Sequence, residues 1–356
     1  MSAMKHGRMD MPTRSVSEES EAKLQSLQAQ LGELQESVTL ASVQDDMEEI
    51  RTTLSLLPTE IADVRSRGYV FQSFLEQKVD VLSNQWEDAS RQISREVPRL
   101  TRELQREADE AERALHEAMA GGNVKLSRAE SAVEGLQHRI SGATSTINGM
   151  YANLQQNVNQ TKSQVEQIQW LLEQVDQASF RLRPAEDPVA ACEAQFMETK
   201  KEGPKGVLYL TDERLIFEQK EKKATKKVLF IATEKETVQE LVFGVPVGQI
   251  EKIEAKQKGL LGHKEIMELQ FAPEADLSGA LLRLRGADNE EWAGLIGRVR
   301  SGEISKERSS PEETEMREEV RDAPTKCPTC GAALSVEIVR GMREITCEYC
   351  GTVIRL

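Results

Sequence analysis

Four cysteines near the C-terminus are the residues whose type and spacing best support chemistry in this chain. Cys327, Cys330, Cys347 and Cys350 form the pattern C-x2-C-x16-C-x2-C, within the segments CPTCG and CEYCG. Paired Cys-x-x-Cys turns can present two thiolates each to one ion, and four thiolates are a common ligand set of structural zinc. The spacing predicts a zinc site with sulfur at all four positions, which leaves no open position for a substrate.

The residues around the cysteines predict a small β module that holds both turns. A glycine follows each pair and allows the backbone to bend tightly. Runs at 334–339 and 344–346 predict a hairpin, and 353–356 predicts a third strand. The segment 325–356 resembles a zinc ribbon, with the module itself assigned to 326–356. Two disulfides or iron in a rubredoxin-like site are the alternatives, but no sign of secretion accompanies the cysteines, which favours a metal.

No catalytic arrangement accompanies the cysteines. The histidines fall in a terminal tail, on helical faces and in a loop, and no glycine-rich phosphate loop or nucleophile motif is present. The odd cysteine, Cys192, is interpreted as a small apolar residue at the start of a β domain. The sequence therefore favours a protein without enzyme activity.

Two lysine-rich segments in the middle of the chain predict a binding surface. The first is interpreted as a loop between strands and contains Lys220, Lys222, Lys223, Lys226 and Lys227. The second is the tip KQKGLLGHK, with Lys258, Leu260, Leu261 and Lys264. Lysines attract anionic headgroups or acidic proteins, and paired leucines at a glycine-bounded tip suit insertion into an interface. The alternatives are a solvated hairpin tip and a turn that folds its leucines over an open barrel end.

The segment that carries these lysines predicts a small antiparallel β-barrel or sandwich closed by a helix. Its strand-like runs are 207–210, 214–218, 228–232, 238–243, 247–255, 264–271 and 281–284, followed by a helical run at 289–299. The LYLTDERLIF segment, the meander after it and the helix with Trp292 resemble GRAM and bacterial pleckstrin-homology (PH)-like domains, over residues 190–302. The resemblance implies a non-catalytic module that binds lipid headgroups, membranes or proteins, with Trp292 in the core.

The segment before the β domain, 21–182, predicts a long helical coiled coil. Apolar residues recur at steps of three and four, most regularly over 126–182, where a stutter follows Ile147. Pro58 is expected to interrupt an early helix, with a new helical start at Thr59. The sequence Gly-Gly-Asn at 121–123 predicts a helical hairpin. The competing interpretation is one long helix that pairs with the same helix of another chain.

Composition narrows the choice of partner. The 356-residue chain has a net charge of −14, which argues against nucleic acid because duplex binding needs a basic face. Residues 1–20 are expected to form a disordered tail, and 303–325 a charged linker. Neither a secretory signal nor a membrane-spanning stretch is found in the sequence, so a cytoplasmic protein is expected, with peripheral contact to membranes.

These features predict a multidomain α + β protein: a long coiled coil, a small antiparallel β-barrel with a closing helix, and a zinc ribbon. The favoured function is a cytoplasmic adaptor or scaffold that self-associates through the coil and docks on a membrane surface or a protein partner. One alternative is a zinc-ribbon factor associated with nucleic acid or transcription. Another is a structural stalk in which both small domains are caps.

Overall fold

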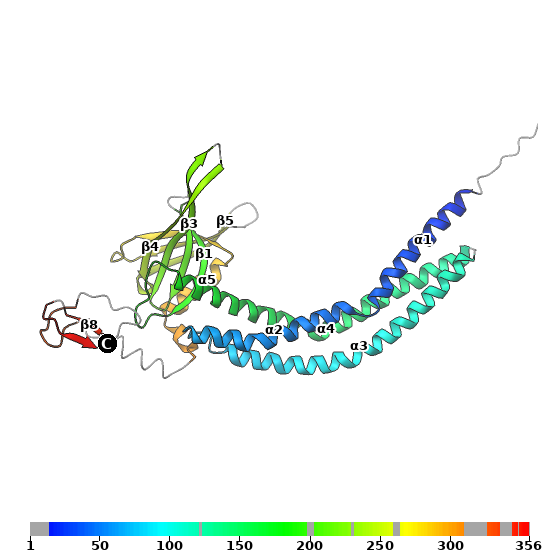
Figure 1. Ribbon diagram of the computed structural model, residues 1–356, viewed down its shortest axis with the longest axis horizontal. Coiled ribbons are helices and arrows are strands. Elements are labelled where there is room, and N and C mark those ends of the chain that lie inside the picture. The colour runs from blue at the N-terminus through cyan, green and yellow to red at the C-terminus, as the bar shows by residue number, and fades with distance from the viewer. Residues whose placement is uncertain are drawn as a thin grey trace, which may run out of the picture. The chain divides into compact units, whose positions relative to one another are not determined.

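The computed structural model describes residues 14–120, 123–197, 203–228, 231–258, 264–309, 326–334, 344–347 and 349–355. The chain forms two compact units, one of Met1–Leu56 with Val79–Gln160, and one of Leu57–Lys78 with Thr161–Leu356. The helices are α1 (Arg14–Ser37), α2 (Ala41–Ser66), α3 (Leu75–Met119) and α4 (Asn123–Asp176) (Figure 1). The first unit is helical in its described residues, and the second joins helix ends to a β-sheet.

In the first unit, α3 and α4 are antiparallel neighbours within one chain. Glu117 on α3 pairs with Arg128 on α4 at 3.8 Å. Glu107 pairs with Arg139 at 3.2 Å, so the partner moves forward along α4 as the residue moves back along α3. The chain thus reverses between Met119 and Asn123, where the sequence predicts a hairpin; residues 121–122 lie outside the described residues.

The helix α1 lies beside both of these helices. Gln30 donates to Gln137 on α4 at 3.1 Å, and Gln35 donates to Glu112 on α3 at 3.4 Å. The apolar seam of α4 in this unit is buried, with Ala129, Val133, Leu136, Ile140, Ala143, Ile147, Tyr151, Leu154 and Val158. Because the seam is covered within one chain, no second chain is needed to bury it, and self-association remains a prediction.

The expected interruption at Pro58 is wrong. The helix α2 continues through Pro58 to Ser66, so Thr59 does not begin a new helix. A proline inside a helix costs about 3 kcal/mol, whereas burying one Leu or Ile side chain stabilises by about 1.5–3 kcal/mol. Leu57 and Ile61 flank the proline and are 0% and 2% exposed, so burial outweighs the lost hydrogen bond.

Tertiary contacts end α4 at Asp176 rather than at residue 182. The Tyr209 hydroxyl donates to the carbonyl of Gln174 at 3.3 Å. The Gln239 amide donates to the carbonyl of Gln177 at 2.6 Å. These side chains from the sheet donate to carbonyls that a helix end leaves without partners. The helix can therefore end at Asp176 without losing these hydrogen bonds.

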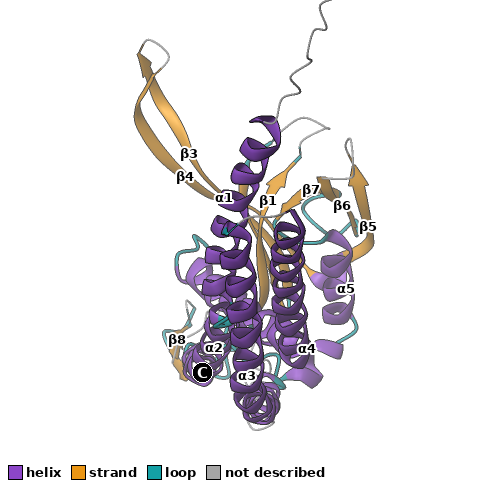
Figure 2. Ribbon diagram, turned by 90° about the vertical axis from the view of Figure 1, so that its right-hand side faces the viewer, coloured by secondary structure: helices purple, strands orange, loops and turns teal. Residues whose placement is uncertain are grey.

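The second unit contains a curled, seven-stranded antiparallel sheet (Figure 2). Its strands are β1 (Pro188–Phe196), β2 (Lys205–Thr211), β3 (Arg214–Val228), β4 (Ile231–Pro246), β5 (Ile250–Lys258), β6 (Lys264–Phe271) and β7 (Gly279–Arg285). Their order is β4-β3-β2-β1-β7-β6-β5, so β4 and β5 are edges, and where the sequence predicts a small antiparallel barrel or sandwich the sheet is an open half-barrel. The short 3-10 helix η1 (Val247–Gln249) connects the two edges.

The sheet differs from the predicted strands at two places. β1 is missing from the prediction because its run of small residues lacks the β-branched and aromatic types that mark strands. The strand predicted at 228–232 is instead the position where β3 ends and β4 begins, so the two strands form one long hairpin.

Aromatic side chains and a closing helix form the core of this sheet. Phe196, Phe217 and Phe243 stack with ring centroids about 6 Å apart, and Phe271 continues the row. The helix α5 (Asn289–Arg300) buries Trp292, Ile296 and Val299 against the sheet. The Asp288 side chain caps α5 by accepting from two backbone N–H groups, at 2.8 and 2.9 Å. Trp292 is thus a core residue, as the resemblance implies.

Residues 303–309 belong to this unit rather than to the predicted linker. A 3-10 helix, η3 (Glu303–Glu307), follows α5. Two backbone bonds tie the segment to the α2–α3 loop, from Ser73 N to Glu307 O at 2.9 Å and from Ser309 N to Val70 O at 2.8 Å. We call residues 303–309 the strap. Its apolar anchor, Ile304, is 3% exposed, which explains why a charged sequence packs here.

Candidate metal centre and binding surfaces

The four cysteines of the pattern meet at one point. Their sulfur atoms all lie within 4.8 Å of one another. Cys327 Sγ is 3.6 Å from Cys350 Sγ, and Cys330 Sγ is 3.7 Å from Cys347 Sγ. Zinc–sulfur bonds of about 2.3 Å in a tetrahedron place neighbouring sulfurs about 3.8 Å apart, whereas a disulfide requires about 2.05 Å. The cluster therefore fits one tetrahedral ion and does not fit two disulfides.

Two equivalent backbone turns place these sulfurs. Cys327 N donates to Ala332 O, and Cys347 N donates to Thr352 O, at 2.8 and 2.9 Å. In each turn the backbone N–H of the glycine donates a hydrogen bond to the carbonyl of the first cysteine at 2.8 Å. Gly331 and Gly351 both have φ of 72°, a left-handed conformation that other residues rarely adopt. The glycine of each CxxCG segment is thus required by the turn.

A small β element supports the turns. β8 (Glu344–Thr346) pairs with β9 (Val353–Arg355). The sequence predicts a strand in each of these runs but does not predict this pairing. Ile345 and Ile354 pack with the buried Cys327 and Cys347, and this group is the module's local core. The other arm of the predicted hairpin, 335–339, lies outside the described residues.

Hydrogen bonds around the thiols shift the pKa values of two of them in opposite directions. The Thr352 hydroxyl, 3.2 Å from Cys350 Sγ, and its backbone N–H lower the pKa of Cys350 to about 6. The backbone N–H of Ala332 lowers the pKa of Cys330, but hydrogen bonds with the other three cysteines, together with burial, raise it to about 12. Four cysteine sulfurs gathered at one point are a donor set that a divalent cation binds as thiolates, so the site fits a metal such as zinc.

The first lysine segment is a strand, which corrects the predicted loop. Lys220, Lys222, Lys223, Lys226 and Lys227 all lie on β3. The Lys220 ammonium donates to the side-chain oxygens of Gln174 and Gln177, at 3.0 and 2.9 Å, at the C-terminal end of α4. The negative end of the helix dipole also stabilises a cation at this position. Lys220 therefore supports the fold rather than a free binding surface.

The second lysine segment lies at the end of the β5–β6 hairpin. Lys258 is the last residue of β5 and Lys264 is the first residue of β6. The two are paired in the antiparallel register. Leu260 and Leu261 lie outside the described residues. Lys256, two residues before Lys258 on β5, forms ion pairs with Glu254 and with Glu268, the latter at 2.7 Å.

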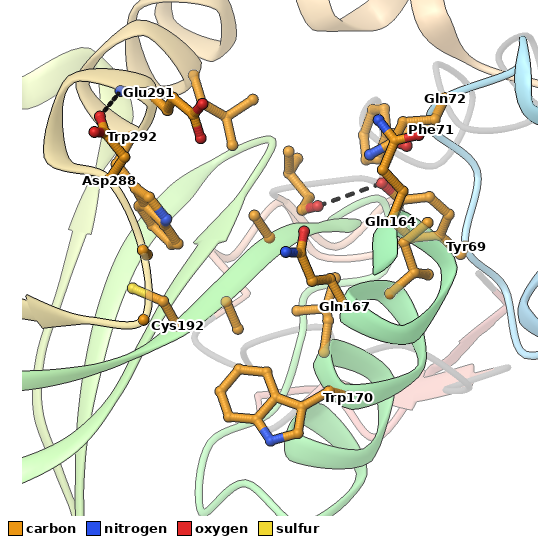
Figure 3. Close-up of a pocket in the computed structure, with 18 of the residues that line it drawn as sticks. Tyr69, Phe71, Gln72, Gln164, Gln167, Trp170, Cys192, Asp288, Glu291 and Trp292 are labelled. Carbon is orange, nitrogen blue, oxygen red and sulfur yellow. Dashed lines mark hydrogen bonds between the residues drawn. The ribbon is translucent and has the colours of Figure 1, made fainter. Parts of the chain in front are cut away.

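Sequence reasoning missed a groove in the second unit. It consists of two cavities, of about 580 and 440 Å3, that share Trp170, Glu193 and Arg285 as lining residues. Figure 3 shows the larger cavity, with Gln164 and Gln167 on α4 at one wall and Trp292 on α5 at the other. The available signal was Trp170, a tryptophan on a helix face otherwise rich in glutamine.

Sequence reasoning also missed the ion pairs of the strap. The Arg308 guanidinium donates to Asp187 at 2.7 Å and to Asp212 at 2.5 Å, and it lies 4.8 Å above the ring of Phe71. Nearby, Arg214 donates to both oxygens of the fully buried Glu186. The acidic pair directly before β1 was the signal for this network.

Comparisons with known proteins give distant structural likenesses. No protein-family model matches the chain. No curated protein sequence matches it either. The structure is similar to the "Vps36 N-terminal PH domain", with 14% identity and a TM-score of 0.23, over 34% of this chain and 83% of that chain.

A second similar structure is a complex of PDZ-RhoGEF DH/PH domains with activated RhoA. It has 10% identity and a TM-score of 0.26, over 77% of this chain and 95% of that chain. The DH/PH domain of human ARHGEF11, in a ternary complex with human RhoA and its inhibitor, has 9% identity and a TM-score of 0.23, over 81% and 99%. At these scores the likenesses carry no argument about ligand or partner.

Among the described residues, no helix is long and apolar enough to cross a membrane.

Proposed function

We propose that this protein is a non-enzymatic adaptor that docks on an anionic membrane surface through two lysine-bearing hairpins, with a zinc-stabilised C-terminal module as a second contact. One observation carries the docking proposal. β2 pairs with β3 only as far as Gln219, whereas β3 and β4 remain paired as far as Val228 and Ile231. The hairpin thus projects beyond the sheet as a two-stranded ribbon. Such a ribbon is marginally stable in water, so contact with a surface is a reason to retain it.

The charge of the ribbon is suited to an anionic surface. Its outer part carries Lys222, Lys223, Lys226 and Lys227 on β3. In the register, Lys223 and Lys226 face Glu236 and Glu234 on β4, while Lys222 and Lys227 face the uncharged Thr237 and Ala232. The ribbon therefore keeps an excess of positive charge within a chain that is acidic as a whole.

The β5–β6 hairpin adds a second basic tip. Like charges directly opposite each other destabilise a strand pair, and Lys258 and Lys264 are opposite. An anionic surface would offset the positive charge of this tip, and Leu260 and Leu261, which lie between the two lysines in the sequence, would supply apolar insertion. Figure 2 shows the β3–β4 and β5–β6 hairpins extending toward the same end of the sheet, which is the arrangement that a shared docking surface needs.

The remaining parts of the chain support this role. The two antiparallel meanders, β1–β4 and β5–β7, and the closing helix α5 support the PH-like resemblance of the sequence. The long helices would serve as a spacer. Each lysine near a charged surface contributes about 1 kcal/mol, so self-association through the helices would strengthen a weak single contact by avidity. A cytoplasmic location at the membrane periphery belongs to the same proposal.

Vesicle sedimentation of the full chain tests the docking. We expect binding to vesicles with phosphatidylserine and not to neutral vesicles, and weaker binding as salt screens the charges. Lys222→Glu with Lys227→Glu should lower binding at least tenfold, and Leu260→Asp with Leu261→Asp should lower it further. The matched control, Lys162→Glu with Lys306→Glu, makes the same charge change on exposed lysines outside the hairpins and should bind normally. A full chain that ignores anionic vesicles at low salt would overturn the proposal.

A further inference from the structure

One edge of the seven-stranded sheet is exposed and apolar. β4 is hydrogen-bonded to β3 alone, so in the described part of the sheet the backbone N–H and C=O groups on its other side have no strand partner. We call residues 240–246 of β4 the β4 edge. Behind it, β3 is itself paired with β2 as far as Gln219, the residue opposite Glu240. The β4 edge therefore belongs to the main sheet rather than to the ribbon that projects beyond it.

Two adjacent side chains make this edge apolar. Leu241 and Val242 are 43% and 37% exposed, and in the part of the sheet that the structure describes they are the two large hydrophobic side chains that are exposed. On β4, Phe243 pairs with Phe217 and Leu241 pairs with the next residue of β3. Val242 is therefore an extra residue, which makes a β-bulge. The bulge interrupts the alternation of a strand, which would otherwise turn one of two neighbouring side chains toward the core.

The opposite edge of the sheet, β5, carries a protection that the β4 edge lacks. On β5, Lys256 forms ion pairs with Glu254 on the same strand and with Glu268 on β6. Charged side chains discourage another chain from pairing with an edge strand. Along the β4 edge Glu240, at one end, is the only charged residue. The rest of this edge is open to an apolar strand.

The length and twist of the β4 edge favour a short segment over a second copy of this chain. About seven residues at about 3.3 Å each give an edge of roughly 23 Å, and Pro246 ends it because proline has no N–H to donate. A stable dimer uses about 20–30 residues on each side, so pairing of two β4 edges falls far short. A bulge also increases the local twist, which one extended segment can follow more easily than the edge of a second sheet.

We propose that the β4 edge is a docking site for an extended apolar segment of a partner protein, which adds to the sheet as a further strand. The free N–H and C=O groups of β4 would pair with the backbone of the segment, and Leu241 and Val242 would contact its apolar side chains. This inference does not depend on the membrane docking proposed above, because the lysines of that proposal lie on the projecting ribbon and on the β5–β6 hairpin.

Fluorescence anisotropy with the full chain tests strand addition. The probe is the labelled, capped peptide QTVTVTQ, whose sequence has no charged residue. Two further probes carry N-methyl groups on alternate residues, one probe for each of the two phases, with the side chains unchanged. Because alternate N–H groups of a strand point to opposite sides, one N-methylated probe should bind at least tenfold more weakly and the other nearly as well as the parent. Equal binding of both, or no binding of the parent, would overturn the proposal.

Substitutions on the edge locate the site. Leu241→Lys with Val242→Lys gives the β4 edge the kind of protection that β5 has and should weaken binding of the parent probe at least tenfold. The matched control is Leu56→Lys with Val81→Lys, the same two substitutions at 51% and 47% exposed positions on α2 and α3, which should bind normally. Circular dichroism and thermal unfolding show whether each variant remains folded. Unchanged affinity in a folded edge variant would refute the assignment to β4.

Two further measurements separate the alternatives. Lys222→Glu with Lys227→Glu should bind the probe normally while losing anionic vesicles, so failure of one proposal is distinguishable from failure of the other. Sedimentation velocity shows whether the chain self-associates through this edge. A dimer that Leu241→Lys with Val242→Lys abolishes would assign the edge to a second copy and refute the proposal of a partner segment.

Discussion

The cysteine module and the groove both gather several side chains, but they draw them from very different lengths of chain. The four cysteines lie between residues 327 and 350, and each pair is placed by hydrogen bonds inside one short turn. The groove takes residues from the α2–α3 loop, α4, β1, β7, α5 and the strap. A local site can be recognised by its spacing and can be removed alone. A site assembled from distant segments depends on the contacts that hold those segments together.

The largest expected effect is on the cysteine module. Cys347→Ser should abolish metal binding and unfold residues 326–356, because binding of structural zinc supplies about 10–16 kcal/mol of folding free energy in such modules. The sheet of the second unit should keep its stability. Metal analysis of the purified protein, together with thermal unfolding, measures both effects.

Cys192→Ala is the matched control, since Cys192 is buried in β1, away from the sulfur cluster. It should retain one zinc per chain. Zinc bound at full stoichiometry by Cys347→Ser, or two disulfides in the native protein, would contradict the local metal centre.

The second prediction concerns the strap, whose ion pairs join distant segments of the chain, in contrast to the local cysteine module. Arg308→Ala should destabilise the second unit by about 3–5 kcal/mol, because Asp187 and Asp212, at 2% and 4% exposure, would lose the guanidinium that pairs with both of them. Urea unfolding followed by circular dichroism measures the loss. Arg300→Ala, at an exposed site on α5, should change stability by less than about 0.5 kcal/mol. If both variants unfold alike, the strap does not hold the segments together.

The third prediction is a dependence on acid. Burial alone would raise the pKa of Glu186, but hydrogen bonds from Arg214, the backbone of Arg183 and Thr211 lower it below 4.5. A lowered folded-state pKa means that Glu186 stabilises the fold above its unfolded value and that this contribution is lost as pH falls through the folded value. Stability should therefore fall below about pH 4.5.

Unfolding of Glu186→Gln across pH 2–6 checks this effect. The variant should be less stable at neutral pH and should show a shallower loss in acid. An identical acid slope in both proteins would show that other carboxylates control it.

The smallest expected effect is in the first unit. The Tyr151 hydroxyl lies 2.7 Å from Asp46 Oδ2 and 2.8 Å from Asn148 Oδ1. Tyr151→Phe removes this link between α2 and α4 and should cost about 1–2 kcal/mol. Urea unfolding measures the change. Tyr349→Phe, at a 75% exposed ring in the cysteine module, is the control and should be neutral.

Much of the architecture was predictable from local patterns. The 3–4 spacing of apolar residues predicted the long helices, because a helix with one apolar face must bury it. The CxxCG pairs predicted the sulfur cluster, because the turn and its glycine are encoded within five residues. The strand-turn-strand LYLTDERLIF predicted β2 and β3 for the same reason.

Other features depended on interactions that no local pattern contains. Pro58 stays inside α2 because neighbouring side chains are buried, and α4 stops at Asp176 because the sheet supplies partners for its last carbonyls. The lysines of β3 lie on a strand because β4 pairs with it along its whole length, which composition alone does not reveal.

The sequence by itself determined the helical seams, the β-rich middle and the metal-binding spacing, since each is written in residues a few positions apart. Only the tertiary structure decided the open sheet, the strap and the groove. Arg308 is 121 residues from Asp187 and 96 residues from Asp212 in the sequence, yet it pairs with both at one buried point. Trp170 and Arg285 line the same cavity although they lie far apart in the sequence, on α4 and on β7. Such meetings depend on packing of the whole unit, which is why the chemistry of the groove is invisible in the sequence.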